Sequence, residues 1–182
     1  MNNNWSKNVL WMVLTVSFLI TWGCASTKGS YAPITPIKEG TDFSKYSTLF
    51  LEVKSKTGVS IFITDRDRIL GQIIAALRKD YPARFTEINH ATPGATTLYA
   101  IVNITRYDKG NAFARSMLAG LGAMHINADV ALSDYESKET LGTFECKKTF
   151  AWGGAYGGST TIEQIEEGFA KAVAASIAEG KK

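Results

Sequence analysis

Residues 124–132 read MHINADVAL, a nearly strict alternation of apolar and polar side chains. Successive side chains of a β-strand point to opposite faces, so this pattern predicts a strand with one core-facing and one solvated side. The core-facing residues would be Met124, Ile126, Ala128, Val130 and Leu132. A strand that is covered on one face only is typical of an antiparallel sheet.

Similar strands flank this segment. A polar turn over residues 134–140 leads into a partner strand at Leu141–Trp152. Consecutive strands joined by a short turn pair antiparallel in the simplest arrangement. Upstream, Leu98–Tyr107 predicts a strand with Leu98 on its core face and Tyr107 on the opposite face.

Two weaker strands and one helix precede them. Alternation predicts strands at residues 49–53 and 84–89. Between these strands, apolar residues recur every three or four positions from Ile69 to Tyr81, which predicts a helix with one buried side. Thr64-Asp65 would begin this helix and Pro82 would end it.

The last element is a second helix. Thr160 and Glu163 have the spacing of a capping box, and an apolar stripe follows as far as Ile177. The charged cluster Asp65–Arg68 lies at the start of the first helix, where acidic side chains favour the positive end of the helix dipole. We therefore expect that cluster to be a solvated capping face.

These elements predict an α+β fold in the order β-α-β-β-β-β-α. A single domain would contain a mostly antiparallel or mixed sheet of about five strands, with two helices on one face. Cys146 lies between Phe144 and Phe150 at the period of a strand and is expected in the core as a small hydrophobe.

The N-terminus has the pattern of an export signal. Lys7 precedes the apolar run Val9–Ile20, which is much shorter than the roughly 20 residues of a membrane-spanning helix. Thr21-Trp22-Gly23-Cys24 resembles a bacterial lipobox, which implies cleavage before Cys24 and diacylation of its thiol. The alternative is an uncleaved N-terminal anchor. In Gram-negative lipoproteins, an Asp directly after the acylated cysteine resembles an inner-membrane retention signal. This chain has Ala25 at that position, which favours the outer membrane, with the domain facing the periplasm.

Three regions follow from this reading. Residues 1–23 would be the lipoprotein signal peptide, residues 24–42 a lipidated tether rich in Ser, Gly and Pro, and residues 43–182 the envelope domain. Two acyl chains are sufficient for stable membrane attachment.

No motif predicts catalysis, a metal or a cofactor other than the covalent lipid on Cys24. A formal charge of +3 without a dense basic stripe gives no reason to expect a nucleic-acid partner. His90 and His125 are a weak candidate metal pair. The segment Gly153–Gly158 lacks the Gly-Lys-Ser/Thr of a phosphate loop, so we expect a flexible turn there.

One apolar segment is a candidate contact surface for a partner. Phe113, Met117, Leu118 and Leu121 lie among glycines and alanines between two predicted strands. These side chains could pack beneath the sheet, or they could face a partner protein or lipid.

The second half of the chain resembles a known family. The resemblance rests on the order of five features along the chain. These are the strand Leu98–Tyr107, a glycine-containing segment with Arg115, a strand ending in Asp134, the pair Leu141-Gly142 and an alanine-rich helix. This order resembles the Gram-negative lipoproteins of domain of unknown function 4410. The resemblance extends over roughly residues 43–177 and implies an envelope lipoprotein without assigned chemistry.

The sequence thus predicts a non-enzymatic, lipid-anchored envelope protein that docks another envelope protein. The alternative is a domain that binds a small hydrophobic or lipid-like ligand between its sheet and helices. A hydrolase is a third possibility that no motif supports.

Overall fold

The computed structural model describes residues 28–89, 92–118 and 120–180. The predicted signal peptide, Cys24 and His90 lie outside these residues. The strands are β1 Ser30–Thr35, β2 Thr48–Ser55, β3 Glu87–Ile88, β4 Thr97–Asp108, β5 Met124–Asp134 and β6 Thr140–Phe150. The helices are α2 Ile63–Asp80, α3 Ala112–Met117, α4 Gly154–Ser159 and α5 Ile162–Glu179, with a 3-10 turn η2 at Phe43–Lys45.

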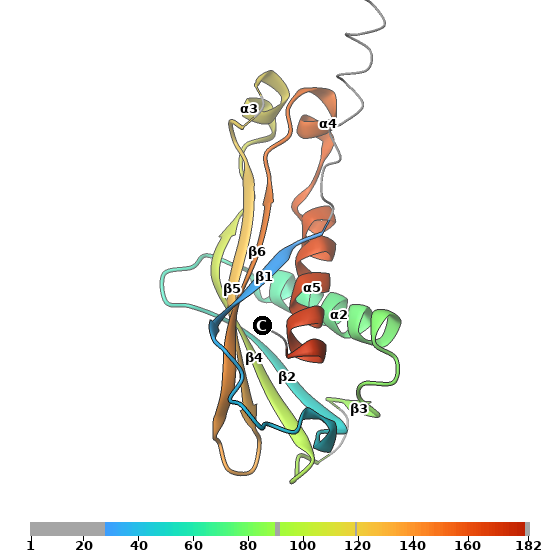
Figure 1. Ribbon diagram of the computed structural model, residues 1–182. Helices are drawn as coiled ribbons and strands as arrows, with labels where there is room; N and C mark the ends of the chain where they lie inside the picture. Colours follow the sequence, from blue (N-terminus) through green and yellow to red (C-terminus); the bar gives the residue numbers. More distant parts are fainter. Residues whose placement is uncertain (1–27, 90–91, 119, 181–182) are drawn as a thin grey trace, which may run out of the picture.

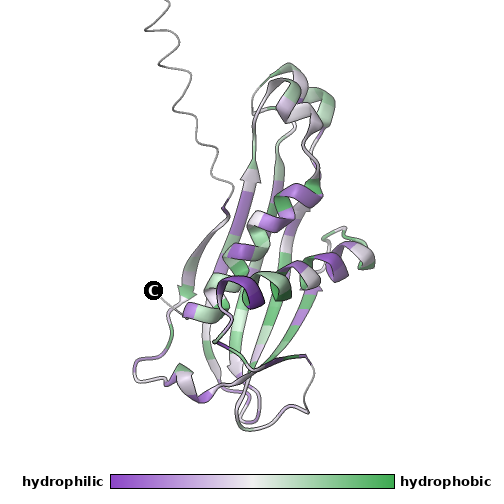
Figure 2. Ribbon diagram, turned by 90° about the vertical axis from the view of Figure 1, so that its right-hand side faces the viewer, coloured by the Kyte–Doolittle hydropathy of each residue, from purple (hydrophilic) through white to green (hydrophobic). Residues whose placement is uncertain are grey.

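The strands form one six-stranded sheet in the order β1-β6-β5-β4-β2-β3. β4, β5 and β6 are an antiparallel meander, whereas β2 is parallel to β3 and β4 because α2 separates them in the chain. Both long helices cover the same face of the sheet (Figures 1 and 2). The predicted α+β class with helices on one face is confirmed.

The core lies between this sheet face and the two long helices. All five apolar residues predicted for the core face of β5 are buried, as is Cys146 on β6. Burial raises the pKa of the Cys146 thiol to about 12, so this side chain is an unreactive core residue at neutral pH. Among the described residues, no helix combines the length and apolarity of a membrane span.

The predicted tether is wrong over residues 30–35, which form the edge strand β1. Ser30 pairs with Lys147 of β6 and the ring of Tyr31 packs at 6.2 Å from that of Phe144. Without β1, β6 would be an unpaired edge, and Pro33 is tolerated because edge strands need not donate at every position. The ordered domain therefore starts before residue 43.

A β-bulge in β4 reverses the predicted orientation of Tyr107. The pairing with β5 shifts between Ile104 and Arg106, so Tyr107 lies opposite Ile126, a core residue. An extra residue in one strand moves every later side chain to the other face. Tyr107 therefore points toward the helices, and its prediction on the opposite face is wrong.

Three boundaries differ from the predicted ones. The capping box of α5 is Thr161 and Gln164, one residue later than expected, with Gln164 Oε1 accepting from the Thr161 N–H at 3.0 Å. α2 begins at Ile63 after Phe62, without a side-chain cap. Within the predicted strand 84–89, only Glu87 and Ile88 pair in the sheet.

Gly71 gives a stability prediction. It lies in the interior of α2, is exposed, and has no atom within 4 Å of the position that a Cβ would occupy. Gly71→Ala is expected to raise the free energy of unfolding by about 1 kcal/mol, because alanine loses less backbone entropy in a helix. Urea unfolding followed by circular dichroism measures this, and a variant no more stable than the parent contradicts it.

Candidate functional site

In the charged cluster at the start of α2, Asp65 and Arg68 belong to a clamp around a buried glutamate, which corrects the expected solvated face for these two residues, whereas Asp67 is exposed. Arg68 Nε lies 2.6 Å from Glu166 Oε2, and Arg68 Nη2 lies 2.7 Å from Asp65 Oδ1. Tyr107 donates its hydroxyl to Glu166 Oε1 at 2.7 Å. Glu166 is completely buried, and Asp65 nearly so. The clamp joins α2, α5 and β4, so its arrangement is structural.

Two groups of the clamp, Tyr107 and Arg68, keep a single protonation state near neutral pH. Burial, and then the hydrogen bond to Glu166, raise the pKa of Tyr107 well above its usual range, so its phenol stays protonated. The carboxylate of Glu166 raises the pKa of Arg68, which stays cationic. Neither of these two groups is poised to exchange a proton near neutral pH.

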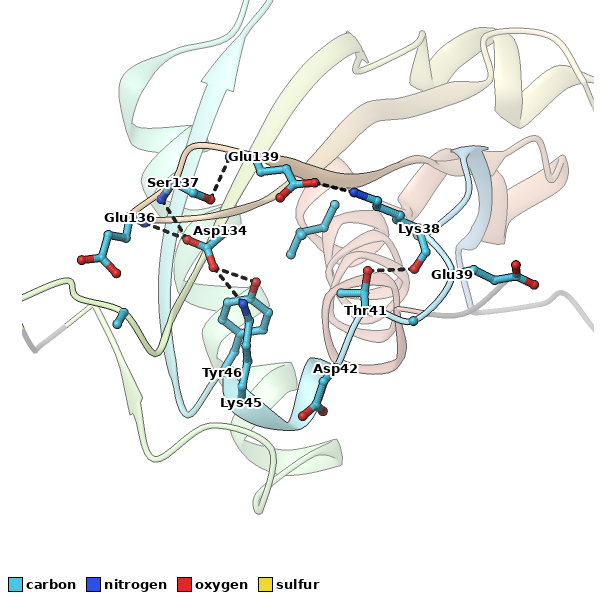
Figure 3. A pocket seen from close by; sticks show the side chains of 13 residues that line it. Lys38, Glu39, Thr41, Asp42, Lys45, Tyr46, Asp134, Glu136, Ser137 and Glu139 are labelled. Carbon is cyan, nitrogen blue, oxygen red and sulfur yellow. Dashed lines mark hydrogen bonds and ion pairs between the residues drawn. The ribbon is translucent and has the colours of Figure 1, made fainter.

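An open pocket of about 700 Å³ lies at the end of the β5–β6 hairpin (Figure 3). Asp134 is its most buried acidic residue, and it accepts hydrogen bonds from the Ser137 N–H at 3.0 Å and from the Tyr46 hydroxyl at 3.0 Å. Lys45 Nζ lies 3.1 Å from the same carboxylate. Oδ1 thus closes the hairpin by accepting from backbone N–H groups, while Oδ2 joins the hairpin to Lys45 and Tyr46.

Asp134→Asn is expected to destabilise the domain at pH 7 by about 1–2 kcal/mol, because it removes a charged hydrogen-bond acceptor. The Ser137 N–H, Lys45 and Tyr46 lower the folded-state pKa of Asp134. A carboxylate with a lowered folded pKa contributes its full stabilisation above the unfolded pKa of about 4 and loses it progressively as pH falls from there toward the folded pKa. The difference between parent and variant should therefore shrink between pH 7 and pH 3 in urea titrations; a constant difference contradicts the assignment.

The apolar residues singled out from the sequence lie at the opposite end of the domain. α3 and α4 pack side by side beyond the ends of β5 and β6 (Figure 1). They and the loops beside them expose six large side chains, which we call the apical patch. These are Phe113 (73% exposed), Met117 (64%), Leu118 (61%), Leu121 (52%), Trp152 (41%) and Tyr156 (59%).

Arg115 holds the support of this patch together. Its guanidinium is buried and donates to the carbonyls of Gly122 and Gly157 at 2.8 Å, and to that of Thr160 at 3.2 Å. A fourth bond goes to the carbonyl of Lys109 at 3.3 Å. One cation thus joins the loops on both sides of α3 to α4, and no carboxylate takes part.

Two glycines allow the same close packing. Gly122 has φ +64°, and a Cβ there would overlap the carbonyl oxygen of Asn111. A Cβ at Gly157 would overlap the backbone carbonyl of Trp152. Any other residue would push the two loops apart. The apical patch is therefore displayed on a tightly built support rather than on a loose loop.

The structure separates the alternatives that the sequence left open. Phe113, Met117, Leu118 and Leu121 do not pack beneath the sheet, since each is more than half exposed. The flexible turn predicted at 153–158 is wrong, because these residues form most of α4 against α3. Sequence reasoning missed Trp152 and Tyr156; two large aromatics in a glycine-rich connection were the available signal.

The remaining predicted positions do not converge. His125 Nδ1 lies 3.1 Å from Thr149 Oγ1 on the sheet, while His90 lies outside the described residues. The described part of the chain holds no group of three or more His, Cys, Asp or Glu residues placed to bind a metal ion. Cys24, the predicted lipidation site, also lies outside it.

Comparison with solved structures identifies the fold. Two structures of the PelC dodecamer from Paraburkholderia phytofirmans align with TM-scores of 0.55 and 0.53, at 8% and 10% identity, covering 82% of this chain and 97% of PelC. At this identity the likeness shows the fold alone. The comparison with curated proteins gives no match. The sequence model of "Domain of unknown function (DUF4410)" matches residues 36–154, well over half of the 182 residues, so the chain belongs to the DUF4410 family.

Proposed function

We propose that this chain is an exported lipoprotein, held on the outer membrane by acyl chains on Cys24, whose domain docks another envelope component from the periplasmic side. The domain is non-catalytic in this proposal and works by contact. The observation that carries the proposal is the apical patch, six exposed apolar side chains on a support fixed by buried Arg115. Exposed apolar patches on a rigid support are typical of docking surfaces.

The component expected from the sequence is an envelope protein. PelC, which shares the fold, assembles as a dodecamer, so further copies of this chain are one such partner. Lipid is the other material that can cover an apolar patch. Among the described residues, the opposite end exposes no apolar cluster of this size, and the hairpin 134–140 there carries Asp134, Glu136, Lys138 and Glu139.

The alternative function, which is binding of a small hydrophobic or lipid-like ligand between the sheet and the helices, has less support. The side chains between β4–β6 and the two long helices form one continuous packed core. The pocket of Figure 3 lies outside that core and is lined largely by charged and polar residues. A second pocket, beside the end of α2 and β3, is also peripheral.

The anchor is tested by the intact mass of protein extracted from membranes. We expect the parent chain to begin at Cys24 and to carry the mass of the acyl chains. We expect the Cys24→Ala variant to retain its signal peptide and to carry no acyl mass. An unacylated parent that retains residues 1–23 would replace the lipoprotein with an N-terminal anchor.

Docking is tested with a photocrosslinking amino acid placed at Phe113 or Leu121 in cells. The matched control is the same probe at Glu136, which is exposed on the hairpin at the other end. Adducts with protein or lipid at both apical positions, and few at the control, are expected. Equal labelling at all three positions would overturn the apical patch as the docking surface.

A further inference from the structure

We infer that the apical patch enters the headgroup region of the same membrane leaflet that holds the acyl chains of Cys24. This inference rests on the proposed function, because it requires the lipid on Cys24. It names the bilayer as the component that the patch contacts.

The chain enters the domain on the apical side. The Gly29 N–H donates to the carbonyl of Gly168 at 2.9 Å, in the first half of α5. Lys148 Nζ donates to the carbonyl of Lys28 at 3.2 Å. β1 then runs away from the apical end, antiparallel to β6, with Ser30 opposite Lys147. Lys147 lies three residues, or roughly 10 Å of strand, before β6 ends at Phe150.

The chain from Cys24 to Ser30 is about as long as the distance from Ser30 to the patch. Cys24 lies six residues before Ser30, and a fully extended chain spans at most about 3.5 Å per residue, hence about 21 Å. The apical patch lies beyond the end of β6 by about the width of one helix, on the order of 10 Å, and so stands roughly 20 Å from the level of Ser30. Even a fully extended chain thus lifts the patch no higher than the level of Cys24, so a domain upright on its anchor holds the patch at the membrane surface.

The chemistry of the apical end fits a lipid interface. Residues 109–123 and 151–161 contain no Asp or Glu, and the buried Arg115 is already satisfied by carbonyls. Insertion therefore desolvates no carboxylate. Trp and Tyr are enriched where bilayer and water meet, and apolar side chains such as Phe113 and Leu121 add buried area below them. Charged side chains at the hairpin end make that end unsuited to the same contact.

Trp152 provides the test, since it is the only tryptophan after Gly23. The acylated chain is purified from membranes and reconstituted into vesicles of phosphatidylethanolamine and phosphatidylglycerol. Vesicles with brominated acyl chains should quench Trp152 emission at least two-fold relative to unbrominated vesicles. In the control W152F/Y135W the tryptophan sits on the hairpin at the other end of the sheet, and its emission should be unchanged.

A second variant separates contact from anchoring. Phe113→Ser with Met117→Ser and Leu121→Ser should still float with the vesicles, because the acyl chains remain, while quenching of Trp152 falls by more than half. Parent protein that floats but shows unquenched, water-exposed Trp152 emission would overturn the bilayer contact, keep the anchor and return the patch to a protein partner. Parent protein that neither carries acyl mass nor floats would overturn the proposed function itself.

Discussion

Arg68→Met is expected to lower the free energy of unfolding by about 3–5 kcal/mol. Glu166 is completely buried, and Arg68 supplies two of its hydrogen bonds, at 2.6 and 2.8 Å. Without the guanidinium, the carboxylate would be left buried with only the Tyr107 hydroxyl as a donor. An uncompensated buried charge costs far more than a lost surface pair.

Urea unfolding followed by circular dichroism measures this effect. The matched control is Arg106→Met, which breaks a 3.0 Å pair with Asp108 whose side chains are both about half exposed, and should change stability by less than about 1 kcal/mol. The double variant R68M/E166M should regain much of the loss, because the charge of Glu166 is then removed and Asp65 keeps its 3.2 Å pair with Lys109. Equal effects of Arg68→Met and Arg106→Met would show that the clamp contributes no more than a surface pair.

Arg115→Met is expected to lower the free energy of unfolding by about 2–4 kcal/mol and to loosen the apical end selectively. The substitution keeps the apolar stem of the side chain but removes the donors to four backbone carbonyls. Buried carbonyls without a partner are costly, so the loops around α3 and α4 should open to water. Amide hydrogen exchange should accelerate in residues 110–118 and 153–160 while β4 and β5 stay protected.

The control for this prediction is Arg78→Met, an exposed arginine near the end of α2. It should leave both stability and apical hydrogen exchange unchanged within error. Uniform exchange across the sheet in Arg115→Met would mean that the residue stabilises the whole domain without fixing the apical patch. In that case the patch would not be held by its own support.

Much of the fold was predictable because it depends on the local periodicity of apolar residues in the sequence. The alternation at residues 124–132 and the helical spacing from Ile69 to Tyr81 each place their own apolar face, whatever lies opposite. The bulge near Thr105 was not predictable in this way. The bulge turns Tyr107 to the other face because the pairing register with β5 shifts between Ile104 and Arg106. This shift cannot be predicted from the sequence of β4 alone.

The candidate site was predictable only in its composition. Four apolar residues at 113–121 stood out, but whether they were core or surface depended on how the chain returned at 152–160 to form α4. The clamp was misread for the same reason, since Asp65 and Arg68 have the composition of a solvated helix start. Their arrangement depends on Glu166, about a hundred residues later, which pairs with Arg68, and Arg68 in turn pairs with Asp65.

The sequence by itself determined the α+β class, the faces of the long strands and helices, and the family resemblance, because these depend on residues within a few positions of one another. The tertiary structure alone decided that residues 30–35 close the sheet edge, that Asp65 and Arg68 are clamped by Glu166, and that the apical patch is exposed. The physical reason is that edge pairing, charge burial and side-chain exposure are set by partners distant in the chain. Their identity exists only once the sheet and helices have packed.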